Sequence, residues 1–82
     1  MKPITFTAHC KTGMQMIEEA ILAAKQECNC LPGTIHLSTF WAGQLQQAAA
    51  LMIEGQEVQI EYRRQAKYTI KVMIGEKDHV AF

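Results

Sequence analysis

Residues 58–74, VQIEYRRQAKYTIKVMI, contain two runs in which apolar and polar side chains alternate. The apolar members are Val58, Ile60 and Tyr62 in the first run and Tyr68, Ile70, Val72 and Ile74 in the second. Alternation with a period of two is typical of strands that bury one face. If both runs face one core, opposite residues pair as Ile60 with Ile70, which favours a five-residue connection over 63–67. This stretch therefore predicts an antiparallel hairpin.

The N-terminal part of the chain predicts a strand followed by a helix. Residues 4–10, ITFTAHC, alternate in the same way as the two later runs. Thr12 and Gln15 have the spacing of a capping box, in which each side chain bonds the other residue's backbone N–H. Apolar residues then recur at three- and four-residue steps as far as Cys28, so we expect an amphipathic helix ending there.

A second helix is expected in the middle of the chain. Pro32 and Gly33 break the first helix. Ser38 or Thr39 then has the character of a helix cap, and Gly55 that of a helix end. The residues between them are rich in alanine and glutamine, which favour helix.

These elements define the expected fold. Short additional strands are allowed at residues 34–37 and 80–82, with a turn at 75–78. The order strand, helix, helix, strand, strand predicts a single α+β domain over residues 1–82. We expect an antiparallel sheet of three to four strands with both helices packed on one face.

Charge and hydropathy exclude several classes of protein. Eight basic and eight acidic residues give no net charge. A general binder of nucleic acid or of membrane surfaces would carry a clear positive excess. The chain has no apolar stretch long enough to span a bilayer, and its first residues lead into a strand pattern rather than a signal peptide. We therefore expect a soluble protein without membrane partners.

The cysteines indicate a reduced protein. Cys10 and Cys28 flank the first expected helix, which would separate them by roughly 25 Å. Cys28 and Cys30 are too close in sequence for an easy disulfide, so we expect free thiols and a cytoplasmic location. Cys28, Cys30, His36 and His79 are the candidate zinc ligands, but the Cys-x-Cys spacing differs from that of ordinary zinc sites. We expect no metal and no cofactor.

One short motif has the composition of an active site. Residues 9–13, HCKTG, resemble the start of the cysteine-phosphatase loop, His-Cys-x-x-Gly-x-x-Arg. In that family backbone amides and the arginine hold a phosphate that the cysteine attacks, which a helix N-terminus favours. Here Met16 occupies the arginine position, and Asp78 is the only aspartate in the sequence that could protonate the leaving group. We therefore expect no enzyme activity.

The remaining candidate site is a group of basic residues. Half of the basic residues lie within the expected hairpin 63–71, namely Arg63, Arg64, Lys67 and Lys71. The expected second helix adds Trp41 and Leu51 as apolar contacts.

These residues suggest a protein that works by binding. We expect a small protein-binding module, with an inhibitor of a host complex, of the kind found in phages and mobile elements, as one form. It would contact its target through the hairpin or the second helix. The alternative is a nucleic-acid-binding accessory domain that uses the hairpin on phosphates. Both a monomer and a homodimer agree with the sequence.

Overall fold

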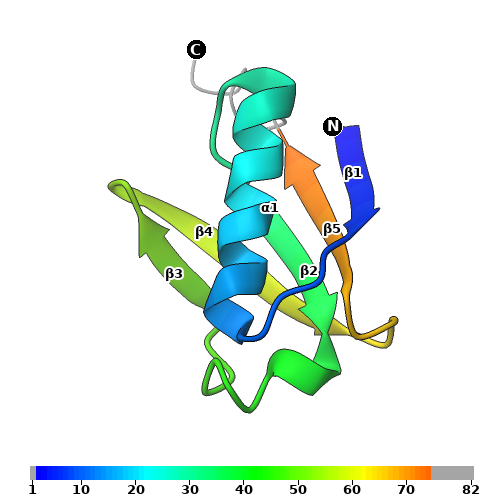
Figure 1. Cartoon of the computed structure of the whole chain (residues 1–82). Helices are drawn as coiled ribbons and strands as arrows, with labels where there is room; N and C mark the ends of the chain where they lie inside the picture. Colours follow the sequence, from blue (N-terminus) through cyan, green and yellow to red (C-terminus); the bar gives the residue numbers. More distant parts are fainter. Residues whose placement is uncertain (1, 75–82) are drawn as a thin grey trace.

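The computed structural model describes residues 2–74, in which one helix lies across one face of a five-stranded sheet (Figure 1). In chain order the elements are β1 (Lys2–Thr7), α1 (Gly13–Cys28), β2 (Thr34–Ser38), the 3₁₀ turn η1 (Thr39–Trp41), β3 (Ala50–Ile53), β4 (Gln56–Arg63) and β5 (Thr69–Ile74). The expected turn at 75–78 and strand at 80–82 lie outside the described residues.

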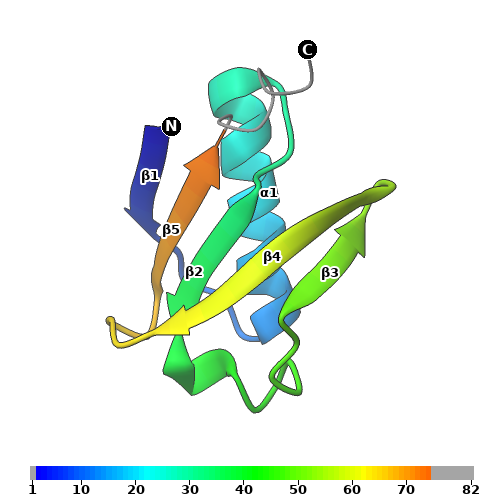
Figure 2. The ribbon, with the colours of Figure 1, turned by 180° about the vertical axis from the view of Figure 1, so that it is seen from behind.

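The sheet is mixed rather than antiparallel. Its strand order is β1-β5-β2-β4-β3, and β2 runs parallel to β4 while every other neighbouring pair is antiparallel. The expected antiparallel sheet of three to four strands with two helices is therefore wrong, although the chain is α+β overall. Seen from behind, β2 lies between β4 and β5 (Figure 2).

The expected hairpin over 63–71 is also wrong, because β4 and β5 do not pair with each other. Ile60 lies opposite Ile35 of β2, and Ile35 lies opposite Val72 of β5. The connection over residues 64–68 thus crosses the end of β2. Alternation had shown which side chains of the two strands face the core, but alternation does not identify the neighbouring strand.

The expected second helix is replaced by η1, a series of turns and β3. Gln46 and Gln47 both have φ of 55°, which ends any helix at that point. Glu54 and Gly55 also have positive φ, as a two-residue hairpin turn requires, and this turn pairs Ile53 with Gln56. Pairing of β3 with β4 therefore overrides the helical propensity of the alanine- and glutamine-rich stretch.

Helix α1 forms where the sequence predicts it. Thr12 and Gln15 make both bonds of the expected capping box, and Asn29 ends the helix in the left-handed conformation. Ala20 and Ala24 are fully buried, so these small residues allow α1 to approach the sheet closely.

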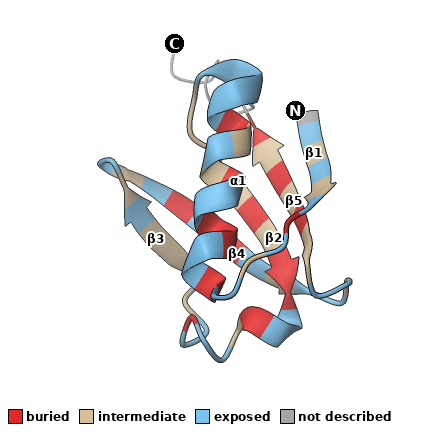
Figure 3. Ribbon diagram, viewed as in Figure 1, coloured by how far each residue is buried: buried red, intermediate tan, exposed pale blue. Residues whose placement is uncertain are grey.

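The core lies between α1 and the sheet, where Figure 3 shows the buried positions alternating along β2, β4 and β5. Fully buried strand residues are Ile35, Leu37, Val58, Ile70 and Val72.

Candidate functional site

The loop over residues 64–68 lies at the end of β2 and is fixed there by Gln65. The side-chain amide of Gln65 donates to the carbonyl oxygens of His36 (3.2 Å) and Thr69 (2.8 Å). These bonds connect the loop to the backbone of both β2 and β5. The loop that carries Arg64 and Lys67 is therefore held against the sheet.

Lys67 and Phe40 form a cation–π contact beside this loop. The Lys67 ammonium lies 4.0 Å from the centroid of the Phe40 ring and 5.0 Å from that of Tyr68. Beneath them, the indole N–H of Trp41 donates to the backbone oxygen of Lys67 at 2.6 Å. We name Phe40, Trp41, Lys67 and Tyr68 the aromatic–lysine cluster. It brings together two parts of the chain that are far apart in sequence.

Phe40, rather than Trp41, is the aromatic side chain available to a partner. Phe40 is 53% exposed, whereas Trp41 is 1% exposed and belongs to the core. The two rings meet edge to face with centroids 5.0 Å apart. The apolar contact expected from the sequence, Trp41, is therefore not at the surface. The available signal for this turn was the cap at Ser38, whose hydroxyl accepts from the Phe40 N–H.

Leu51 does not lie on a helix surface. It belongs to β3, is half-buried and packs against the core, facing Val58 of β4. The expected apolar contact of Leu51 on a second helix is therefore not formed.

Arg63 and Lys71 lie on the face of the sheet opposite α1, away from the aromatic–lysine cluster. There the guanidinium of Arg63 bonds the Glu61 carboxylate, which is also 3.5 Å from His36 Nε2. Lys71 lies opposite His36 in the strand register. The hydrogen bond from Arg63 lowers the pKa of Glu61, while burial, followed by the charge of Arg63, lowers the pKa of His36.

The four basic residues therefore do not form one patch. Arg63 and Lys71 contribute to a charged row in which Glu61 forms an ion pair with Arg63. Lys67 joins the aromatic–lysine cluster, and Arg64 is exposed beside it in the chain. Within residues 2–74, Arg64 has no ion pair, so its charge is directed to solvent or to a partner.

The phosphatase-like residues 9–13 are already hydrogen-bonded. The backbone N–H groups of Lys11 and Thr12 donate to the side-chain oxygen of Gln15, and that of Gly13 donates to Gln44. Burial, followed by the carboxylates of nearby glutamates, raises the pKa of the Cys10 thiol. A phosphate would have to displace these amide oxygens, and the thiol favours its unreactive protonated form.

Cys28 and Cys30 form a disulfide, contrary to the expectation of free thiols, with their Cα atoms 5.3 Å apart. The turn that follows α1, with Asn29 in the left-handed conformation, brings the two side chains together. Among residues 2–74 no three potential metal ligands converge, and His79 lies outside that part. The expected cytoplasmic location rested on free thiols and stays a prediction.

In residues 2–74 no helix is both long and apolar enough to cross a membrane.

Comparison of the chain with models of protein families, with curated proteins and with solved structures gives no match in any of the three.

Proposed function

We propose that this chain is a non-catalytic protein-binding module that uses Phe40, Lys67 and Arg64 as its contact surface. The observation that carries the proposal is the exposed Phe40 ring lying under the Lys67 ammonium. Aromatic and arginine side chains supply most of the energy at protein interfaces, and a partner with acidic and apolar groups would complement this surface.

The fixed backbone of the surface favours binding. Trp41 and Gln65 hold the 64–68 loop through side-chain bonds to backbone oxygens. A preformed surface loses less conformational entropy on association than a mobile loop does. An inhibitor of a host complex, of the phage or mobile-element kind, is the form of this activity that we expected from the sequence.

Single-stranded nucleic acid is the second candidate partner. An exposed aromatic ring beside basic side chains is the arrangement on which bases stack while phosphates meet positive charge. Phe40 with Lys67 and Arg64 has this composition.

Affinity capture with two matched variants tests the proposal. The tagged chain is incubated with bacterial lysate, with and without nuclease, and captured proteins are identified by mass spectrometry. We expect Phe40→Ala and Arg64→Gln to reduce capture of a partner at least tenfold. Arg63→Gln is the control, because the neighbouring Arg63 is engaged by Glu61 and should retain the partner.

Nuclease treatment and a salt titration of binding separate the two candidate partners, a protein and a single-stranded nucleic acid. A protein that stays bound after nuclease treatment and in moderate salt supports the proposed function. Recovery of nucleic acid alone supports the second candidate. In that case the affinity should fall with salt at a log–log slope of about −1.4 to −1.8 if Lys67 and Arg64 contact two phosphates. Equal capture by all variants would exclude this surface from both.

A further inference from the structure

A groove lies between α1 and β3, and none of its lining residues belongs to the aromatic–lysine cluster. It has a volume of about 430 Å³, and Ile21 and Leu22 of α1 face Ile53 of β3 across it. Met14 and Leu22, which line it, are 48% and 49% exposed. This groove is therefore an apolar surface that the described chain leaves open to solvent.

The groove exists because one helix is too narrow for this sheet. Five strands spaced about 4.8 Å apart span roughly 24 Å, whereas a helix is about 10–12 Å across. Figure 1 shows β3 and the neighbouring part of β4 extending past α1. A second helix beside α1 would be the usual cover for such a two-layer arrangement.

The charges on the groove identify which helix fits. Glu18 and Lys25 both line it and lie on the same side of α1, two turns apart. Their midpoint falls between Ile21 and Leu22. If an antiparallel copy of α1 is related by a twofold axis at this midpoint, each Glu18 lies opposite Lys25 of the partner subunit. Each Lys25 would then lie between Glu54 of its own chain and Glu18 of the partner subunit, an arrangement that repeats on both sides of the axis, as an isologous interface requires.

Lys25 is also held in position for this contact. Its ammonium bonds the Glu54 carboxylate at 2.5 Å, which holds it over the groove between α1 and the end of β3. A second carboxylate arriving from a partner would share this ammonium.

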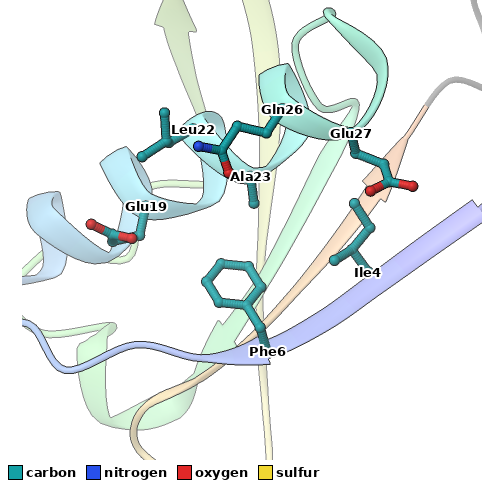
Figure 4. A pocket seen from close by; sticks show the side chains of 7 residues that line it. All are labelled: Ile4, Phe6, Glu19, Leu22, Ala23, Gln26 and Glu27. Carbon is teal, nitrogen blue, oxygen red and sulfur yellow. The ribbon is translucent and has the colours of Figure 1, made fainter.

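The groove on the other side of α1 provides a contrast. It has a volume of about 330 Å³ and lies between α1 and β1, and its apolar lining is Ile4 and Phe6 of β1 with Leu22 and Ala23 of α1 (Figure 4). The described residues that line it include Glu19 and Glu27 but no lysine or arginine. A twofold contact across that lining would pair no opposite charges of the lining, whereas the β3-side groove offers Lys25 to Glu18.

We propose that the groove between α1 and β3 binds α1 of a second copy of this chain, forming a twofold symmetric homodimer. Ile21 and Leu22 meet at the axis, and Glu18 forms ion pairs with Lys25 of the partner subunit. The dimer covers the exposed Met14 and Leu22 of the groove and carries two aromatic–lysine clusters. It does not depend on the function proposed for those clusters.

The test uses sedimentation velocity on the full chain from about 1 μM to 1 mM. We expect wild type to dimerise in this range. Glu18→Lys alone and Lys25→Glu alone each place like charges opposite one another, so each dissociation constant should rise at least tenfold. An equimolar mixture of the two variants restores both ion pairs and should form a heterodimer with nearly wild-type affinity.

Two controls keep the result specific. Glu19→Lys reverses a charge on the β1-side groove and should leave the dimer unchanged. Phe40→Ala should also leave it unchanged, which separates this proposal from the proposed function. Circular dichroism confirms that each variant is folded. A wild type that is monomeric at 1 mM, or a mixture no stronger than its components, would overturn the proposal.

Discussion

The two faces of the sheet are built from the same strands but differ in every property that matters for stability. On the face covered by α1, Ile35, Val58 and Val72 are fully buried. On the opposite face, seen towards the viewer in Figure 2, the corresponding row contains Lys71, His36 and Glu61. Among residues 2–74 no helix covers this second face.

The difference shows how stability and surface chemistry are separated in a small domain. Alternate residues of one strand serve the two faces, so the apolar residues supply the packing energy. The polar residues between them are left to form a charged row on the uncovered face. This face contributes little energy, and the contact surface proposed for partners lies beyond its end, in the 64–68 loop and η1.

Ile35→Ala should produce the largest change. Ile35 lies in the central strand between Ile60 and Val72, and its truncation should cost about 2–5 kcal/mol. Because a domain of this size has on the order of 5 kcal/mol of stability, much of the variant should be unfolded. The neighbouring Thr34→Ala, on the uncovered face, should change stability by about 0.5 kcal/mol or less. Urea unfolding measures both, and equal effects would contradict the assignment of Ile35 to the covered face and Thr34 to the uncovered face.

Reduction of the Cys28–Cys30 disulfide should have a smaller effect on the covering helix. The bond closes a very short loop, so its stabilisation should be well below the roughly 3 kcal/mol expected for a 15-residue loop. Thiol titration of the unfolded protein should find one free thiol before reduction, from Cys10, and three after it. Three thiols in protein purified without reductant would show that the bond does not form.

Thr12→Ala should destabilise the start of the same helix by about 1 kcal/mol. The Thr12 hydroxyl accepts from the Gln15 N–H, and alanine removes this cap. Thr12→Ser retains the hydroxyl and serves as the control in urea unfolding. A loss as large for serine as for alanine would exclude the cap as the cause.

Acidification should produce the smallest change, and it should act through the uncovered face. The pKa of His36 is lowered by burial, so the folded protein favours neutral histidine. Between the unfolded value of about 6.5 and the lower folded value, the unfolded chain binds more protons, and stability falls as the pH falls. Glu61, whose pKa is also lowered, adds a loss in the same direction at lower pH. His36→Gln should remove the upper step from unfolding curves measured between pH 7 and 5.

Local features of the fold could be predicted from the sequence. The capping box at Thr12 and the buried face of the strand around Ile70 follow from short-range patterns, and both are confirmed. Strand neighbours could not be predicted, because Ile35 lies in a stretch of five residues with too little pattern to identify the central strand. The prediction of a second helix failed because Gln46 and Gln47 adopt positive φ. Nothing in the residue type glutamine indicates that conformation.

The candidate site was predictable only in part. Lys67 and Arg64 were selected from charge alone, and both stay predictions as contact residues. Their separation from Arg63 depends on β2 lying between β4 and β5, a tertiary arrangement with no local signal. Phe40 and Trp41 are adjacent aromatic residues, and the turn at Ser38 decided which became exposed.

The pairing of β1 with β5 has a consequence for folding during synthesis. Residues 2–7 find their strand partner only in residues 69–74, close to the other end of the described chain. At about 5–20 residues per second, a ribosome needs several seconds to make the segment between them. Throughout that time β1 lacks its neighbour, and contacts so distant in sequence form slowly. Helix α1 can form early, but the sheet it covers is completed last.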